Sequence, residues 1–154
     1  MKSLLVVLSL IVFSLSSCDK NKVYQKYVSL PDYAWLKTNS IDFKVNIEDT
    51  AIAYNVFLNV RHTDFYPYKN LWVKLKSQVN DKLHWDEEIE LILQEKSGKW
   101  MSDCSGNICD AKILIKAGEQ FSSAGEYTFT LTQIMRVDPV VAIMDMGLRI
   151  EKAN

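Results

Sequence analysis

The sequence predicts an all-β protein, a single β-sandwich of about seven or eight antiparallel strands. Three observations point to this class. Apolar residues recur with a period of two along several short runs, as they do on half-buried strands. Turn-forming residues separate these runs roughly every 10 residues. No long segment shows the 3.6-residue period of an amphipathic helix.

The first half of the chain contains five runs of this kind. Residues 23–28 are rich in β-formers. Apolar and polar residues alternate along residues 41–47, 54–61 and 71–76, and then along residues 88–93. Each run is therefore expected to form a strand with one buried face and one solvent-facing one.

Three further runs follow in the second half. Residues 111–116 and 127–134 are strand-like, and in the second of these Tyr127, Phe129 and Leu131 share a face opposite threonines. Residues 144–151 form the last run. A helical turn over residues 140–146 is the alternative at the start of this last segment.

The N-terminus has the pattern of an export signal. Lys2 is the only charge before an apolar run that ends near Phe13. The following Leu15-Ser-Ser-Cys18 resembles the bacterial lipobox, whose cysteine is acylated before the chain is cut just ahead of it. We therefore predict a lipoprotein signal peptide over residues 1–17 and a lipid on Cys18. The alternative is an ordinary signal peptide with an incidental cysteine.

The predicted cleavage defines the mature chain, and the composition of that chain limits its partners. Residues 18–22 are expected to form the lipidated cysteine and a short tether, and residues 23–154 the sandwich domain. Cleavage removes one basic residue and no acidic one, which leaves a net charge of −2. No basic patch suggests nucleic acid as a partner. Membrane anchoring must therefore come from acyl chains, and stable anchoring needs at least two of them.

Two cysteines remain beyond Cys18. Cys104 and Cys109 flank a Gly106-Asn107 turn, and an exported compartment permits a disulfide between them. Two free thiols are the alternative. A zinc site would need two more ligands, and the only histidines, His62 and His84, lie in unrelated segments. No metal or other cofactor is therefore expected.

Candidate catalytic residues are few. His84-Trp-Asp-Glu-Glu88 places a histidine beside three acids, which would suit acid–base chemistry or a strand entrance with solvated charges. No nucleophile elbow, zinc-protease motif or phosphate loop is present. We therefore expect no enzymatic activity.

The loop over residues 62–70 is the most informative surface. It carries Phe65, Tyr66 and Tyr68 around Pro67. Aromatic residues on a loop at the end of a sandwich either anchor a partner or cap the open end of the core. Only exposed rings can anchor a partner, so burial decides between the two.

Six motifs along the chain carry a family resemblance. They are Asn55-Val-Phe-Leu-Asn-Val-Arg61, Tyr66-Pro-Tyr-Lys-Asn-Leu71, Gly98-Lys-Trp100, Gly125-Glu-Tyr-Thr-Phe129, Met135-Arg136 and Gly147-Leu-Arg-Ile-Glu151. With the lipobox, their order and spacing resemble the gliding-motility lipoprotein GldH family of Bacteroidota over the whole chain. Cys104 and Cys109 depart from the pattern, because glycine or polar residues are expected there.

The resemblance implies a non-enzymatic lipoprotein needed for surface gliding and linked to the type 9 secretion machinery. It brings no catalytic residues. It does imply that eight residues matter for folding or docking: Arg61, Tyr66, Pro67, Tyr68, Asn70, Met135, Arg136 and Arg149. We expect an assembly component that docks other envelope proteins of this machinery through Phe65, Tyr66, Tyr68 and Arg136.

Two other functions stay open. One is a carbohydrate-binding module of an envelope glycan-uptake system, and the other is a hydrolase that uses His84 and its neighbouring acids. The location is also open, since Asp19 after the lipidated cysteine retains lipoproteins at the inner membrane in some bacteria. The resemblance implies the outer membrane instead. The tether lacks the acidic cluster of a surface-export signal, which favours the periplasmic face.

Overall fold

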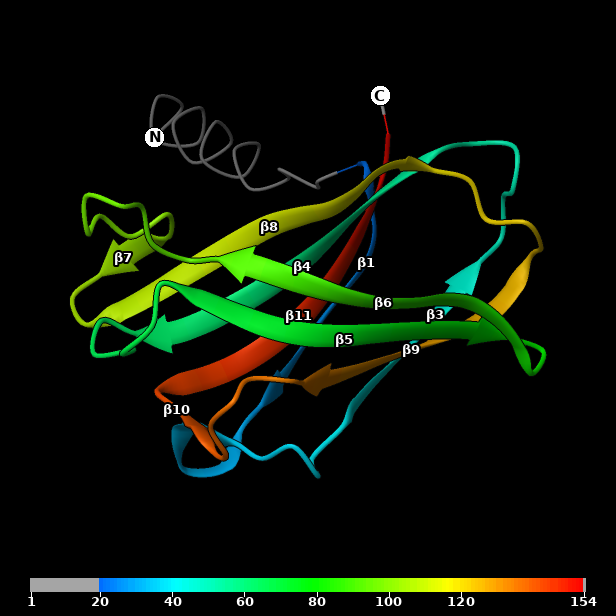
Figure 1. The fold of residues 1–154 in the computed structure, drawn as a ribbon. Coiled ribbons are helices and arrows are strands. Elements are labelled where there is room, and N and C mark those ends of the chain that lie inside the picture. The colour runs from blue at the N-terminus through cyan, green and yellow to red at the C-terminus, as the bar shows by residue number, and fades with distance from the viewer. Residues whose placement is uncertain (1–19, 154) are drawn as a thin grey trace, which may run out of the picture.

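The computed structural model describes residues 20–153, which fold as a two-layer antiparallel β-sandwich (Figure 1). The five-stranded sheet has the order β1 (Lys22–Ser29), β11 (Ile143–Lys152), β4 (Tyr54–Thr63), β8 (Ile108–Glu119) and β7 (Asp103–Ser105). The four-stranded sheet has the order β3 (Ile41–Ile47), β9 (Gly125–Gln133), β5 (Asn70–Val79) and β6 (Lys82–Ile92). A small ribbon pairs β10 (Val140–Val141) with β2 (Ala34–Trp35), which follows the 3-10 turn η1 (Pro31–Tyr33).

The structure confirms the all-β prediction but contains more strands than the sequence indicated. Eight long strands coincide with the eight predicted runs, and β2, β7 and β10 add three strands of two or three residues. A strand this short shows no recognisable period. The helical turn considered for residues 140–146 is wrong, because β10 and β11 occupy that segment. Within residues 20–153, no helix has the length and apolar character needed to cross a membrane.

Strand alternation directs one face of each sheet into a common core. On β3 every second residue is buried, from Ile41 to Ile47. Tyr127, Phe129 and Leu131 of β9 are fully buried, as predicted, and the threonines between them lie on the opposite face. The outer face of each sheet is thereby left available for function.

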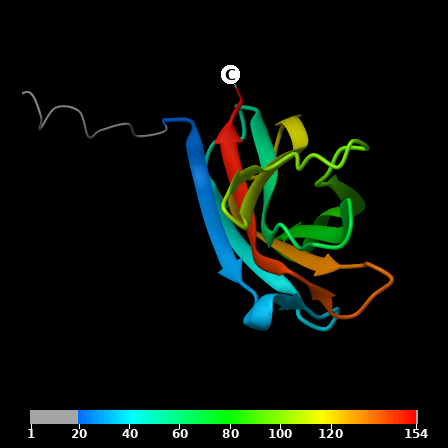
Figure 2. The same cartoon turned by 90° about the vertical axis from the view of Figure 1, so that its left-hand side faces the viewer.

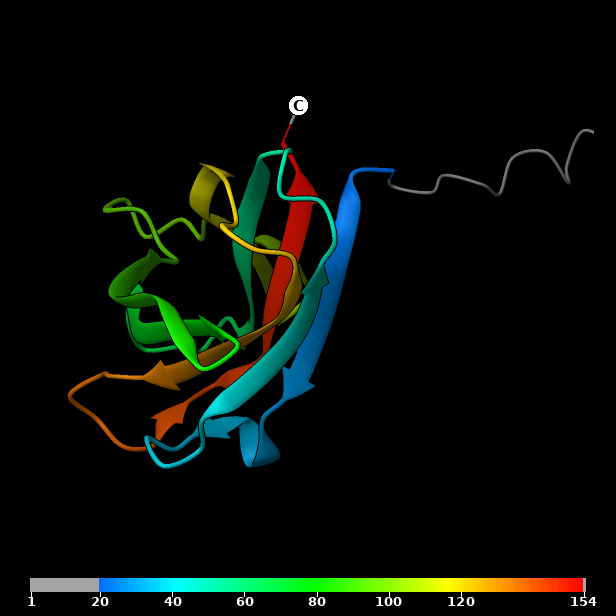
Figure 3. The same cartoon turned by 90° about the vertical axis from the view of Figure 1, so that its right-hand side faces the viewer.

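The two ends of the sandwich differ in their distance from the N-terminal tether. β1 begins at Lys22 and ends at Ser29, opposite Asp145 near the start of β11. At that same end β4 finishes, because His62 pairs with Ile143, and β5 begins there. Figures 2 and 3 show η1 and β10 at the end of the molecule remote from the start of β1. We call this end the distal end; it comprises residues 30–40, 64–69, 93–102, 106–107 and 134–142.

Candidate functional site

The loop between β4 and β5 divides its aromatic residues between solvent and core. Phe65 is 76% exposed, whereas Tyr66 is only 4% exposed. The Tyr66 hydroxyl donates to the carbonyl oxygen of Asn70 at 2.8 Å, and its ring contacts the ring of Tyr68. Burial raises the pKa of the Tyr66 phenol well above its ordinary value. Tyr66 therefore caps the core, which corrects the expectation that its ring is free to dock a partner.

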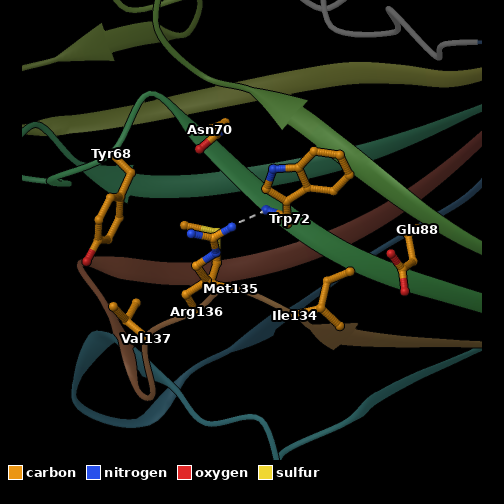
Figure 4. A pocket seen from close by; sticks show the side chains of 8 residues that line it. All are labelled: Tyr68, Asn70, Trp72, Glu88, Ile134, Met135, Arg136 and Val137. Carbon is orange, nitrogen blue, oxygen red and sulfur yellow. Dashed lines mark hydrogen bonds between the residues drawn. The ribbon is translucent and has the colours of Figure 1, made fainter.

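A groove lies at the distal end, on the outer face of the four-stranded sheet (Figure 4). It has a volume of about 580 Å³. The groove is lined by Tyr68, Asn70, Trp72, Glu88, Ile134, Met135, Arg136 and Val137. Four of these, namely Tyr68, Asn70, Met135 and Arg136, belong to the eight residues that the family resemblance marked. Two separate motifs thus meet at one surface.

Hydrogen bonds hold the segment after β9 against β5 and so build one wall of the groove. The backbone N–H of Ile134 donates to the carbonyl oxygen of Trp72 at 3.0 Å. The N–H of Trp72 donates to Sδ of Met135 at 3.2 Å. The N–H of Met135 donates to the side-chain oxygen of Gln133 at 2.9 Å. Gln133 is fully buried and donates to the carbonyl oxygen of Trp35 at 3.3 Å, so this wall is anchored in the core.

Opposite charges stand at the two sides of the groove. Figure 4 shows Arg136 between Tyr68 and Trp72, and Glu88 beyond Trp72. Both side chains are exposed, and neither makes a hydrogen bond or ion pair to another residue in the described range 20–153. The lysine across from Glu88, Lys74, binds Asp86 at 2.9 Å instead. Both charges are therefore free to meet a ligand.

Large exposed apolar side chains cluster around the same end. Twelve such residues occur in the described part of the chain. Five of them belong to the distal end, namely Tyr33, Leu36, Phe65, Met101 and Val141, and three more lie beside it, namely Trp72 in the groove, Ile92 and Ile108. The other four are Val23, Tyr27, Leu83 and Leu114. A concentration of this kind marks interaction surfaces, because isolated exposed apolar residues would be scattered over the molecule.

The candidate catalytic residues do not converge. His84 packs against the ring of Phe121 and lies 3.6 Å from Glu119, whereas Glu87 binds Lys116 at 2.7 Å. Asp86 lies on the outer face of the sheet with Lys74. Among residues 20–153, no three His, Cys, Asp or Glu side chains are grouped as metal ligands.

A hairpin supports the base of the aromatic loop. Cys104 and Cys109 lie opposite each other on β7 and β8 and are joined by a disulfide. The carbonyl oxygen of Asn107, in the hairpin turn, accepts a hydrogen bond from the N–H of Asp64 at 3.0 Å.

The predicted signal peptide and the lipidation site at Cys18 lie outside the described residues.

Arg61 and Arg149 serve the five-stranded sheet, away from the groove. Arg61 binds Asp110 at 2.8 Å and reaches Asp145 at 3.4 Å. Arg149 binds Glu151 and donates to Gln25 at 2.6 Å. These bonds link four neighbouring strands through side chains, so both arginines are engaged within the domain itself.

Sequence reasoning identified Tyr68 and Arg136 but missed Trp72, Ile134 and Val137 as parts of the groove. Trp72 did carry a signal, since it is a large aromatic residue at an outward position of a strand whose next outward residues are lysines. Ile134 and Val137 carried none. Their position follows from the hydrogen bonds that fold the segment after β9 back onto β5.

Comparison with known proteins identifies related chains over nearly the whole length. A profile of the GldH lipoprotein family matches residues 22–150. The gliding motility lipoprotein GldH of Flavobacterium johnsoniae is 28% identical over 96% of this chain and 96% of its own length. A protein of Christiangramia forsetii, named as a homolog of that lipoprotein, is 27% identical over 96% of this chain and 93% of its own length.

Proposed function

The chain belongs to the GldH lipoprotein family, and from this premise we propose that it is a non-enzymatic docking component of the gliding-motility and type 9 secretion machinery. A lipid on Cys18 anchors it in the outer membrane, facing the periplasm. Its distal end binds another envelope protein of the machinery through Phe65, Tyr68 and Arg136. The observation that carries this proposal is the gathering of exposed apolar side chains and a groove at that one end.

The short tether and strand β1 together place the distal end away from the membrane anchor. Strand β1 starts at Lys22, only four positions after Cys18, so the domain begins close to the bilayer. An eight-residue strand is about 26 Å long. Strand β1 runs from the tether to the distal end, and the docking surface is therefore presented away from the lipid anchor, toward soluble or membrane-bound partners.

A cross-linked pull-down from membranes tests the docking role. Phe65→Ala removes an exposed ring at the distal end, whereas Leu83→Ala removes a 65% exposed side chain at the tether end and serves as the matched control. An aromatic anchor typically contributes 2 kcal/mol or more, so we expect about thirtyfold weaker capture of the partner with Phe65→Ala. Leu83→Ala should capture the partner as the unchanged chain does. Equal capture by both variants would refute the proposal.

Anchoring and location need separate measurements. Metabolic labelling with a palmitate analogue should mark the unchanged chain and leave Cys18→Ala unmarked. Protease added to intact cells should spare the protein, and protease added after the outer membrane is opened should cleave it. Cleavage on intact cells would place the domain on the cell surface instead.

A carbohydrate-binding module is the second candidate, because Trp72 is a 38% exposed aromatic residue on a sheet face beside Tyr68. Aromatic rings in such positions can stack on sugar rings. Titration with polysaccharides while tryptophan fluorescence is measured distinguishes the two functions. Saturable quenching that Trp72→Phe reduces would favour carbohydrate.

A further inference from the structure

The lining of the groove indicates which class of ligand fits it. Tyr68, Trp72, Ile134, Met135 and Val137 are apolar or aromatic, and they form its floor and one wall. A saccharide carries a hydroxyl group on most ring carbons, and each buried hydroxyl needs a polar partner. Only three of the eight lining residues are polar, and Asn70 already donates to Glu90. The lining therefore favours a ligand with an apolar side chain at its centre.

The charges define the two ends of that ligand. Arg136 and Glu88 stand on opposite sides of Trp72, and neither has a partner within residues 20–153. A complementary ligand carries an anionic group at Arg136, an apolar group over Trp72, and a cationic group at Glu88. A protein segment can carry all three on successive side chains of one face.

The dimensions agree with an extended chain. The groove crosses from the end of β9 over β5 to β6, which is two strand spacings or about 10 Å. In an extended segment, the side chains of residues i, i+2 and i+4 share a face and span about 13 Å. The long side chain of Arg136 can reach outward and so account for the difference between the width of the groove and the span of the segment.

We propose that the groove binds an extended segment of a partner protein with an acidic, an apolar and a basic side chain at alternate positions. The acidic side chain pairs with Arg136, the apolar one packs on Trp72 and Ile134, and the basic one pairs with Glu88. This inference rests on the proposed docking function and specifies the partner's chemistry at one part of the distal end.

A displayed library of random heptapeptides, selected on the full chain purified in detergent, tests the charge order. The unchanged chain should enrich peptides with an acidic and a basic residue four positions apart and an apolar residue between them. Glu88→Lys should shift the enriched peptides to two acidic residues, and Arg136→Glu to two basic ones. Both positions are exposed, so these variants are expected to fold.

Two further variants control for general electrostatics. Lys99→Glu and Glu48→Lys change net charge by the same amounts at exposed positions outside the groove, and they should leave the enriched sequences unchanged. For an enriched peptide, a mismatched charge should weaken binding up to about fivefold, and Trp72→Ala about tenfold or more.

Three results would overturn the inference. The first is that the unchanged chain and both groove charge variants enrich the same peptide sequences. The second is that the unchanged chain enriches no peptide more strongly than the Trp72→Ala variant does. The third is saturable binding of oligosaccharides that Trp72→Ala abolishes. The Phe65→Ala pull-down is independent of this selection. If capture from membranes depends on Phe65 while the peptide selection fails, the docking function stands and the extended-segment inference does not.

Discussion

Replacement of Gly147 by alanine probes how tightly the first and last strands of the domain are packed. The backbone of Gly147 in β11 does not need a glycine conformation, and alanine is normally favoured over glycine inside a strand by about 0.5–1 kcal/mol. A methyl group here, however, would lie 2.9 Å from Cδ1 of Tyr27 and 3.1 Å from the carbonyl oxygen of Lys26. Whether Gly147→Ala stabilises or destabilises the domain therefore depends on these contacts.

The structure allows the cost to be estimated. The Tyr27 ring must move by about 0.7 Å to restore an ordinary carbon–carbon contact. That movement disturbs the stacking of Arg61 on the ring, whose centroid lies 5.5 Å from the guanidinium carbon. Overpacking costs about 1–3 kcal/mol and an exposed cation–π contact about 0.5–1 kcal/mol. Against the gain in strand propensity, we expect Gly147→Ala to destabilise the domain by about 1–2 kcal/mol.

Urea denaturation followed by intrinsic tryptophan fluorescence, to which the buried Trp35 and Trp85 contribute, measures this change in the free energy of unfolding. Tyr27→Ala removes the ring, so Gly147→Ala in that background should cost at least about 1 kcal/mol less than it costs alone. Free energies that add to within about 0.5 kcal/mol, or a stabilising Gly147→Ala single variant, would refute the packing argument.

Three further predictions concern stability. Tyr66→Ala should cost about 3–5 kcal/mol, as truncation of a buried aromatic ring does, while the neighbouring Phe65→Ala leaves the urea midpoint almost unchanged; equal losses would contradict the assigned burial. Burial lowers the pKa of both His62 and His84, so the folded state binds fewer protons than the unfolded chain and stability should fall below about pH 6.5. The contribution of His62 to this loss is at most about 1.4 kcal/mol per pH unit. Urea titrations at pH values from 7.5 to 5.5 should show that the free energy of unfolding changes less steeply with pH in His62→Gln than in the unchanged chain. An unchanged pH dependence would exclude His62 as a source of the loss of stability. Replacement of Cys104 and Cys109 together by alanine should cost about 2 kcal/mol, as expected for a short closed loop, and an unchanged midpoint in non-reducing buffer would show that the bridge contributes nothing.

The period-two pattern was sufficient to predict the fold class and the eight long strands. Each of these strands buries one face, and the residues of that face are apolar residues at alternate positions, as on β3 and β9. The short strands β2 and β10 were not predictable, because two residues carry no period. They form only because Trp35 and Val140, both buried, pack into the distal end of the core.

The candidate site was only partly predictable. Tyr66 and Phe65 are adjacent aromatic residues, and only the turn that sends one ring inward distinguishes them. Glu88 was recognised as an acid beside His84, but strand alternation places it on the outer face, where Trp72 and Arg136 are its neighbours in the groove. Sequence proximity therefore suggested the wrong companions for Glu88.

Six of the eight residues that the family resemblance marked fall into two structural groups, and a seventh, Tyr66, caps the core. Arg61 binds Asp110 and Arg149 binds Gln25, each on a neighbouring strand of the five-stranded sheet, and the removal of either arginine is expected to lower stability. Tyr68, Asn70, Met135 and Arg136 line the groove at the distal end. Arg136 has no partner within residues 20–153, so its removal frees no other group from an interaction there. In the proposed docking function, Arg136 is the basic residue of the groove that pairs with an acidic side chain of the partner.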